Sequence, residues 1–288
     1  MKAVERFETL FNNYETYKGK MMGDTDVQYM NALNISGQHQ KVIEFAESNR
    51  EDLDVMRRIR GVVARALLME ENFEQLFDWI DFFKTNNMNY PPVNLVYMYN
   101  EIYPSSDSNI FAESFKQEVP KMQILGKAGT WSASSLRNYG SKANGYYLLK
   151  DFARAEKLMT GFTESDLNNH LDNWFGEYFL QYSQLWIEGF LGTIYARQGK
   201  TSQAKAQIEK LESYRPELPG VEGRKVRGVI PYWQARIYAI LGEKENSVIS
   251  LKKAMQEGRM SEHENFVFDW DLANLKDYKP YRDLLNMD

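Results

Sequence analysis

Apolar residues recur along most of the chain at intervals of three and four positions, and strict alternation of apolar and polar residues is almost absent. The first spacing places apolar side chains on one face of an α-helix, whereas alternation would indicate a strand. The pattern therefore predicts a chain built of helices. We expect helices at roughly 3–20, 25–36, 39–48, 53–70, 73–85, 92–103, 108–118, 131–149, 151–162, 168–198, 201–213, 227–241, 244–257 and 277–285.

Turn-forming stretches separate these predicted helices. "NNMNYPP" at 86–92, "YPSSDSN" at 103–109 and "PELPGVEGRK" at 216–225 interrupt the apolar periodicity. Several of the 8 prolines lie at such breaks, where the missing amide hydrogen does not weaken a helix. A long chain of consecutive short helices predicts an all-α fold in which antiparallel helix pairs stack into an α-solenoid.

A repeat becomes visible when positions are counted from one small residue in the first helix of each pair. An apolar residue or tyrosine follows three positions later, a turn residue seven later, a small residue twelve later and an apolar residue sixteen later. The four copies are Gly192, Tyr195, Gly199, Ala204, Ile208; Ala235, Tyr238, Gly242, Ser247, Leu251; Ala143, Tyr146, Lys150, Ala155, Met159; and Ala64, Leu67, Glu71, Leu76, Ile80. Small residues are expected where two helices cross closely, and glycine at the turn suits the left-handed conformation that ends a helix.

This spacing resembles the tetratricopeptide repeat family, strongly in residues 185–258, fairly in 136–162 and loosely in 57–85, with a weaker copy around Gly37. The final "DWDLANLKDYKPYRDLL" resembles the closing segment of such arrays in bacterial proteins. Uneven spacing, 79 residues from Ala64 to Ala143 but 43 from Gly192 to Ala235, argues against a uniform superhelix. We expect an irregular N-terminal region at 1–130 and a region of repeats with a closing segment at 131–288, together forming one continuous array.

Composition narrows the class of protein. The 288 residues carry a formal net charge of −5, which argues against a general nucleic-acid binder. Cysteine is absent, so thiol chemistry and disulfides are excluded. No run of 18 apolar residues is present, and no membrane span is expected. As written, the chain is expected in the cytoplasm; with a leader or anchor removed, it would be exported or membrane-tethered.

Catalytic and cofactor motifs are not marked out in the sequence. Gly199-Lys200-Thr201 superficially resembles the end of a phosphate-binding loop, but Ile194 stands where the first glycine is needed and a helix precedes it. We interpret it as a turn, with Thr201 or Ser202 capping the next helix. The three histidines show no metal-ligand spacing. The sequence thus predicts no catalytic residue, metal or cofactor, and a chain that is not an enzyme. The remaining alternative is an enzyme whose carboxylate site no motif marks, since carboxylates are plentiful.

Candidate binding residues come from the face of the first helices, which lines the concave groove of tetratricopeptide arrays. Glycines inside helices at Gly61, Gly140 and Gly189 would let a ligand approach the backbone; close helix packing is the alternative. Arginines on the same face would form a cationic trough for carboxylates; surface ion pairs are the alternative. The aromatic stripe Trp174, Tyr178, Tyr182, Trp186, Phe190 is typical of a core, or of a binding wall. The predicted groove residues are Arg58, Arg65, Arg137, Gly140, Asn144, Trp186, Gly189, Arg197, Tyr232 and Arg236.

Two functions follow from the resemblance and these residues. The first is a scaffold that binds a protein segment or peptide in its concave groove, where the arginines would favour an acidic one. The alternative is a regulatory or sensor domain of a larger signalling protein, which binds a small molecule in an aromatic pocket around Trp174 to Trp186. The sequence does not identify the partner or the oligomeric state.

Overall fold

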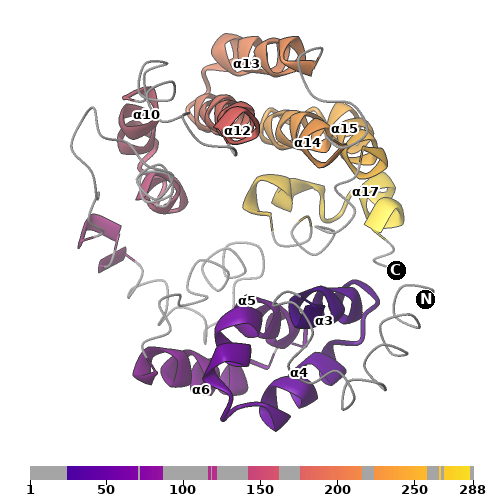
Figure 1. Cartoon of the computed structure of the whole chain (residues 1–288). Helices are drawn as coiled ribbons and strands as arrows, with labels where there is room; N and C mark the ends of the chain where they lie inside the picture. Colours follow the sequence, from indigo (N-terminus) through magenta and orange to yellow (C-terminus); the bar gives the residue numbers. More distant parts are fainter. Residues whose placement is uncertain are drawn as a thin grey trace. The chain divides into compact units, whose positions relative to one another are not determined.

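The chain folds into helices throughout the part that its computed structural model describes, which comprises residues 25–70, 72–86, 116–117, 119–121, 142–161, 176–215, 224–257, 266 and 269–285. Every regular element in those ranges is a helix, so the predicted all-α class is confirmed. The helices predicted at 3–20 and 92–103, the division predicted at residue 130, and the candidates Arg137 and Gly140 lie outside the described residues. Figure 1 shows the arrangement of the helices.

The chain forms two compact units. Unit 1 comprises Met1–Ala112 with His263–Asn265, and unit 2 comprises Glu113–Glu262 with Phe266–Asp288. In unit 1, successive helices pack on each other, and α3 also packs on α5. The helices are α3 (Thr25–Ile35), α4 (His39–Ser48), α5 (Leu53–Met69) and α6 (Phe73–Thr85). Their buried faces contribute a core that includes Met30, Leu33, Met56, Ile59, Leu67, Trp79 and Phe83.

Unit 2 continues the pattern of helix pairs and ends in a short closing segment. In Figure 1, α12, α13, α14 and α15 lie beside one another, and the last residues of the chain follow α15. The elements are η1 (Val119–Lys121), a helical stretch at 142–148, α10 (Phe152–Thr160), α12 (Gly176–Arg197), α13 (Thr201–Ser213), α14 (Arg224–Ile240), α15 (Lys244–Gln256), the 3₁₀-helix η5 (Trp270–Leu275) and α17 (Lys279–Leu285). We call α3, α5, 142–148, α12 and α14 the first helices and their successors the second helices.

One turn geometry recurs between the first and second helix of the described pairs. In each case a backbone N–H donates to the carbonyl five residues earlier, as at the end of a helix closed by a Schellman-type turn. These bonds are Gln38 to Leu33, Asn72 to Leu67, Asp151 to Tyr146, Lys200 to Tyr195 and Glu243 to Tyr238, all at 2.9 Å. The preceding residue has positive φ at Gly37, Lys150, Gly199 and Gly242. Three of these residues lie seven positions after the small residue, where the repeat predicted a turn.

The small residues of the repeat lie at close helix contacts. Ala143, Ala155, Ala204 and Ala235 are completely buried. A Cβ atom on Gly192 would come within 2.4 Å of the Ile237 side chain on α14. Because these positions leave no room for a larger group, the periodic small residues determine how closely neighbouring helices approach.

One local prediction was wrong, and one element was not predicted. Neither Thr201 nor Ser202 caps α13: the N-cap is Lys200, which makes no side-chain capping bond. Because α13 begins at Thr201, the N-cap position falls on Lys200, and both hydroxyl residues already lie inside the helix. The Lys200 ammonium pairs with Glu156 at 2.9 Å. The sequence also did not predict η5, whose six residues lack the apolar periodicity of a longer helix.

Candidate functional site

The carboxylate of Asp271 is the centre of the most highly connected polar cluster in unit 2. Its Oδ1 accepts hydrogen bonds from Arg197 Nη2 at 2.9 Å and from Tyr147 Oη at 2.5 Å. Its Oδ2 accepts from Arg236 Nε at 3.0 Å and from Arg236 Nη2 at 2.6 Å. Tyr147, Arg197 and Arg236 come from three consecutive first helices of unit 2. One carboxylate from the closing segment therefore ties these three helices together.

Asp269 provides the second carboxylate of the cluster. Tyr232 Oη donates to its Oδ2 at 2.5 Å, and Arg236 Nε lies 3.2 Å from the same oxygen. Its other oxygen accepts the backbone N–H of Asp271 at 2.9 Å, which caps the start of η5. Asp269 thus both begins the 3₁₀-helix and pairs with α14.

Trp270, between the two aspartates, packs in an aromatic cage. The guanidinium carbon of Arg197 lies 4.0 Å from the centre of the Trp270 ring, in cation–π geometry. Tyr147 contacts the indole edge-to-face at a centroid distance of 5.3 Å, and Phe152 stacks on it at 6.4 Å. Arg236 in turn lies 4.1 Å above the ring of Trp233. We call Asp269, Trp270 and Asp271 the acid–aromatic–acid segment and its partners on the first helices the inner face of unit 2.

The electrostatics of this cluster follow from burial and charge pairing. Burial alone would raise the pKa of Asp271, but Arg236 and Arg197 more than offset it and hold the pKa below its usual range. Burial raises the pKa of Asp269, and the neighbouring negative charge of Asp271 raises it further, while the positive charge of Arg236 opposes the rise. Burial would lower the pKa of Arg236, yet the two carboxylates raise it. Two positive and two negative groups give a cluster without net charge.

Other predicted groove residues in unit 2 have different environments. Asn144 is half-buried in the stretch 142–148. Trp186 is half-buried and stacks on Phe190 at a centroid distance of 5.3 Å. The rest of the predicted aromatic stripe, Trp174, Tyr178 and Tyr182, has no described side chain. The small-molecule pocket expected there therefore falls largely outside the described residues.

The sequence left two explanations for the helix glycines, close helix packing or close approach of a ligand, and Gly189 and Gly61 differ in this respect. A Cβ on Gly189 would lie 2.2 Å from Trp233 Cγ, so the α14 indole packs directly on the α12 backbone. Close packing explains Gly189, and its backbone is not available to a ligand. Among the described residues, a Cβ on Gly61 of α5 would meet no atom within 4 Å. Packing against the described residues therefore does not explain why position 61 is a glycine.

Gly61 belongs to the stripe of α5 that is not buried in unit 1. Arg58 is exposed and lies one turn before it, and Arg65 is half-buried and lies one turn after it. Arg65 Nη2 donates to Asn31 Oδ1 of α3 at 3.0 Å. Residues at these intervals share one face of a helix, so the two predicted arginines flank the open glycine.

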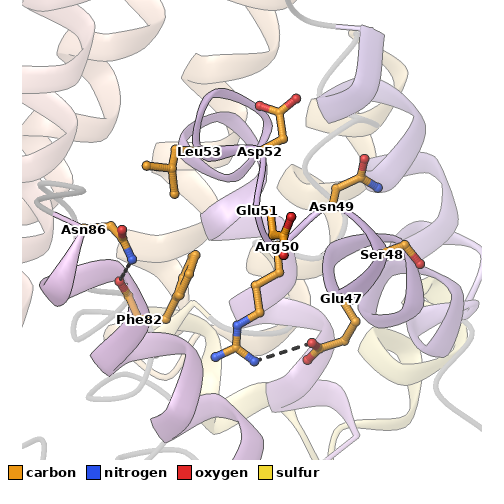
Figure 2. A pocket seen from close by; sticks show the side chains of 9 residues that line it. All are labelled: Glu47, Ser48, Asn49, Arg50, Glu51, Asp52, Leu53, Phe82 and Asn86. Atoms are coloured by element: carbon orange, nitrogen blue, oxygen red, sulfur yellow. Dashed lines mark hydrogen bonds and ion pairs between the residues drawn. The ribbon is translucent and has the colours of Figure 1, made fainter.

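A crevice of about 870 Å³ lies between the α4–α5 turn and the end of α6. Figure 2 shows Arg50 extending between Glu47 and Phe82. Its guanidinium already pairs with Asp78 at 2.6 Å and lies 4.7 Å from the Trp79 ring. The Asn49 and Asn86 amides donate to backbone carbonyls of their own helices. Because these groups are used within unit 1, nothing marks the crevice as a binding site.

Sequence reasoning missed Asp269 and Asp271 as the partners of the predicted arginines. A signal was present: two aspartates flank a tryptophan directly after a series of helices that carry inward-facing arginines. Arg197, Arg236 and Tyr232, which the sequence assigned to one groove face, all contact this acidic segment of the same chain.

Comparison with known proteins adds no family. No protein-family model matches the chain, and no curated protein matches it. In the described part of the chain, no helix has the length and apolar character needed to cross a membrane. The same residues contain no group of three or more histidine, aspartate or glutamate side chains arranged to hold a metal ion. A functional proposal consequently depends on the geometry of the two units.

Proposed function

We propose that this chain is a non-catalytic, tetratricopeptide-like scaffold that binds an acidic protein segment on the first-helix face of unit 1. The observation that supports this function is that Arg236 in unit 2 forms ion pairs with two carboxylates, those of Asp269 and Asp271. Arg236 follows the small residue Ala235 by one position, and Arg65 follows Ala64 by one position. The two arginines therefore occupy equivalent positions in their helix pairs. Because Arg236 binds carboxylates from this position, we infer that Arg65 can do the same.

The binding face on unit 1 consists of Arg58, Gly61 and Arg65 of α5, together with Asn31 of α3. Glycine inside a helix costs about 0.5–1 kcal/mol relative to alanine. At Gly61 no side chain in the described part of unit 1 requires that cost, because none of them comes within 4 Å of the position a Cβ would take. Close approach of a bound peptide backbone explains it. Arg58 and Arg65 on either side then provide guanidinium groups for acidic side chains.

A synthetic peptide array tests this function. The array carries ten-residue peptides that each contain at least two aspartates or glutamates, and it is probed with the labelled full chain. We expect a subset to bind, with an affinity that falls as salt rises, because exposed charges are screened beyond about 8 Å at physiological ionic strength. Gly61→Leu should abolish this binding while the protein stays folded, since the added side chain enters open space. Arg58→Ala should weaken it.

Arg154→Ala serves as the matched control. Arg154 is an exposed arginine on α10 that pairs with Asp151 at 3.3 Å, far from α5 in sequence and in the other unit. Its removal changes the net charge by the same amount as Arg58→Ala and should leave peptide binding unchanged. The proposal is wrong if no acidic peptide binds, or if Gly61→Leu and Arg58→Ala bind the same peptides as the parent chain does.

A further inference from the structure

We propose that the inner face of unit 2 is a recognition site for acid–aromatic–acid segments, and that Asp269, Trp270 and Asp271 of the chain itself are its resident occupant, which a partner segment of the same chemistry displaces. This site is separate from the one on α5 and does not depend on it. The proposal rests on the way in which three first helices contact one short segment.

The contacts have the form of peptide recognition. Side chains of the first helices contact each functional group of the segment: Arg197 and Arg236 contact Asp271, Tyr232 and Arg236 contact Asp269, and Tyr147 and Arg197 contact the indole. Side chains of the array make all of these contacts. These side chains bind two carboxylates and one aromatic ring. That combination is enough to distinguish such a segment from an apolar or basic one.

The chemistry of the cluster favours specificity over stability. A buried ion network adds little net stability compared with well-packed apolar side chains, because the charges lose their hydration. A segment without the carboxylates would leave Arg236, whose side chain is only 14% exposed, without its ion-pair partners. Any segment that lacks two acids at this spacing is therefore strongly disfavoured. This selectivity is the property that a recognition site requires.

The resident segment can leave while the rest of the closing segment stays in place. Phe266 before it and Leu272, Leu275, Tyr281 and Leu285 after it are anchored in an apolar cluster with α14 and α15. The segment forms the N-cap and the first two residues of η5, a six-residue 3₁₀-helix, a geometry with poorer hydrogen bonds than an α-helix. The three resident side chains are buried, whereas the Arg197 side chain that contacts two of them is 23% exposed. Local opening of such elements needs less free energy than global unfolding.

Competition with a tethered segment sets the affinity that a partner needs. Because the resident segment belongs to the same chain, its effective concentration at the site is on the order of millimolar. A partner that offers only the same three side chains would have to be present at a millimolar concentration to compete with the resident segment. An effective partner must therefore make additional contacts along the first helices.

The test uses the full chain with a weakened resident segment. Trp270→Ala removes the indole but keeps both carboxylates, so neither arginine loses its ion pair. The probe is a fluorescein-labelled peptide with the sequence of residues 266–275, followed by fluorescence anisotropy. We expect this peptide to bind the Trp270→Ala chain at least about tenfold more tightly than the parent chain, whose own segment competes at high effective concentration.

Two controls identify the site. A peptide in which both aspartates are replaced by asparagine should not bind the Trp270→Ala chain. Adding Arg197→Ala to Trp270→Ala should weaken binding, whereas adding Arg154→Ala or Gly61→Leu should not, which separates this site from the one on α5. The proposal is overturned if a folded Trp270→Ala chain binds neither peptide, or binds both equally.

A second measurement applies if Trp270→Ala does not fold. A protease site inserted between Gly258 and Arg259 allows the full chain to be cut after folding. A labelled peptide of residues 266–288 is then added in excess, and exchange is followed by size-exclusion chromatography. Incorporation of the label into a folded, cut chain supports a site that accepts segments from outside. Failure to exchange, or unfolding of the cut chain when its segment leaves, shows that the segment is a permanent part of the core and overturns the proposal.

Discussion

Arg236 Nη2 on α14 lies 2.6 Å from Asp271 Oδ2, although the two residues are separated by 35 positions of the chain. The carboxylate is completely buried, and the guanidinium stacks on Trp233. In such an environment each charge depends on the other, because water is not present to solvate the one that remains. The pair thus fixes the closing segment against the last pair of long helices.

Unequal effects are expected when the two aspartates are neutralised one at a time. Asp271→Asn leaves both Arg197 and Arg236 without their shared carboxylate and should destabilise the protein by about 3–5 kcal/mol. Asp269→Asn should cost less, about 1–3 kcal/mol, because Arg236 keeps its contacts with Asp271. Urea unfolding followed by circular dichroism measures both. Equal losses would show that the cluster does not depend on Asp271 in the way its hydrogen bonds indicate.

The two helix glycines form a natural pair for alanine substitution. Gly61→Ala should stabilise the protein by about 0.5–1 kcal/mol, because the methyl group enters open space and alanine favours the helix. Gly189→Ala should destabilise it by about 1–3 kcal/mol, because the new Cβ would overlap the Trp233 ring. Thermal melts of both variants provide the measurement. A stabilising Gly189→Ala would contradict the packing of α12 on α14.

Neighbouring alanines on α13 test the close helix crossings. Ala204 is completely buried, whereas Ala206, two residues later on the same helix, is exposed. Ala204→Leu should overpack the crossing and cost about 1–3 kcal/mol. Ala206→Leu, which adds the same atoms at the surface, should change the unfolding free energy by less than about 0.5 kcal/mol. If the two variants melt at the same temperature, the register of small residues has no structural role.

His39 makes the stability of unit 1 depend on pH. Its Nδ1 lies 3.1 Å from Asn34 Oδ1 of α3, and burial lowers its pKa, with the negative charge of Glu70 offsetting only part of the effect. The unfolded chain therefore takes up a proton at a higher pH than the folded chain does. Stability should fall as the pH drops below about 6.5.

The histidine variant supplies the control for this pH dependence. In His39→Gln, the slope of unfolding free energy against pH between about 5 and 7 should become flatter, since the titrating group that burial perturbs is gone. Urea denaturation of the parent and the variant at several pH values gives the two slopes. Identical slopes would assign the pH dependence to other groups.

Local features of the fold could be predicted from the sequence because they depend on neighbours within a few residues. The helices at His39–Ser48, Phe73–Thr85 and Thr201–Ser213 agree with their predicted bounds. Gly199 and Gly242 adopt positive φ where the repeat placed a helix stop. Apolar periodicity and turn residues act over one or two helical turns, so one chain is enough to read them. The predicted membership of the tetratricopeptide family remains a prediction.

Tertiary structure alone decided what the candidate binding residues contact. Arg197 and Asp271 are 74 positions apart, and no local pattern indicates that they meet. Trp233 covers Gly189 because α12 and α14 pack closely, while Gly61, at the same place in its own helix pair, faces open space. Identical residue types in one register thus have different roles, because those roles depend on which distant side chain the packed helices bring close.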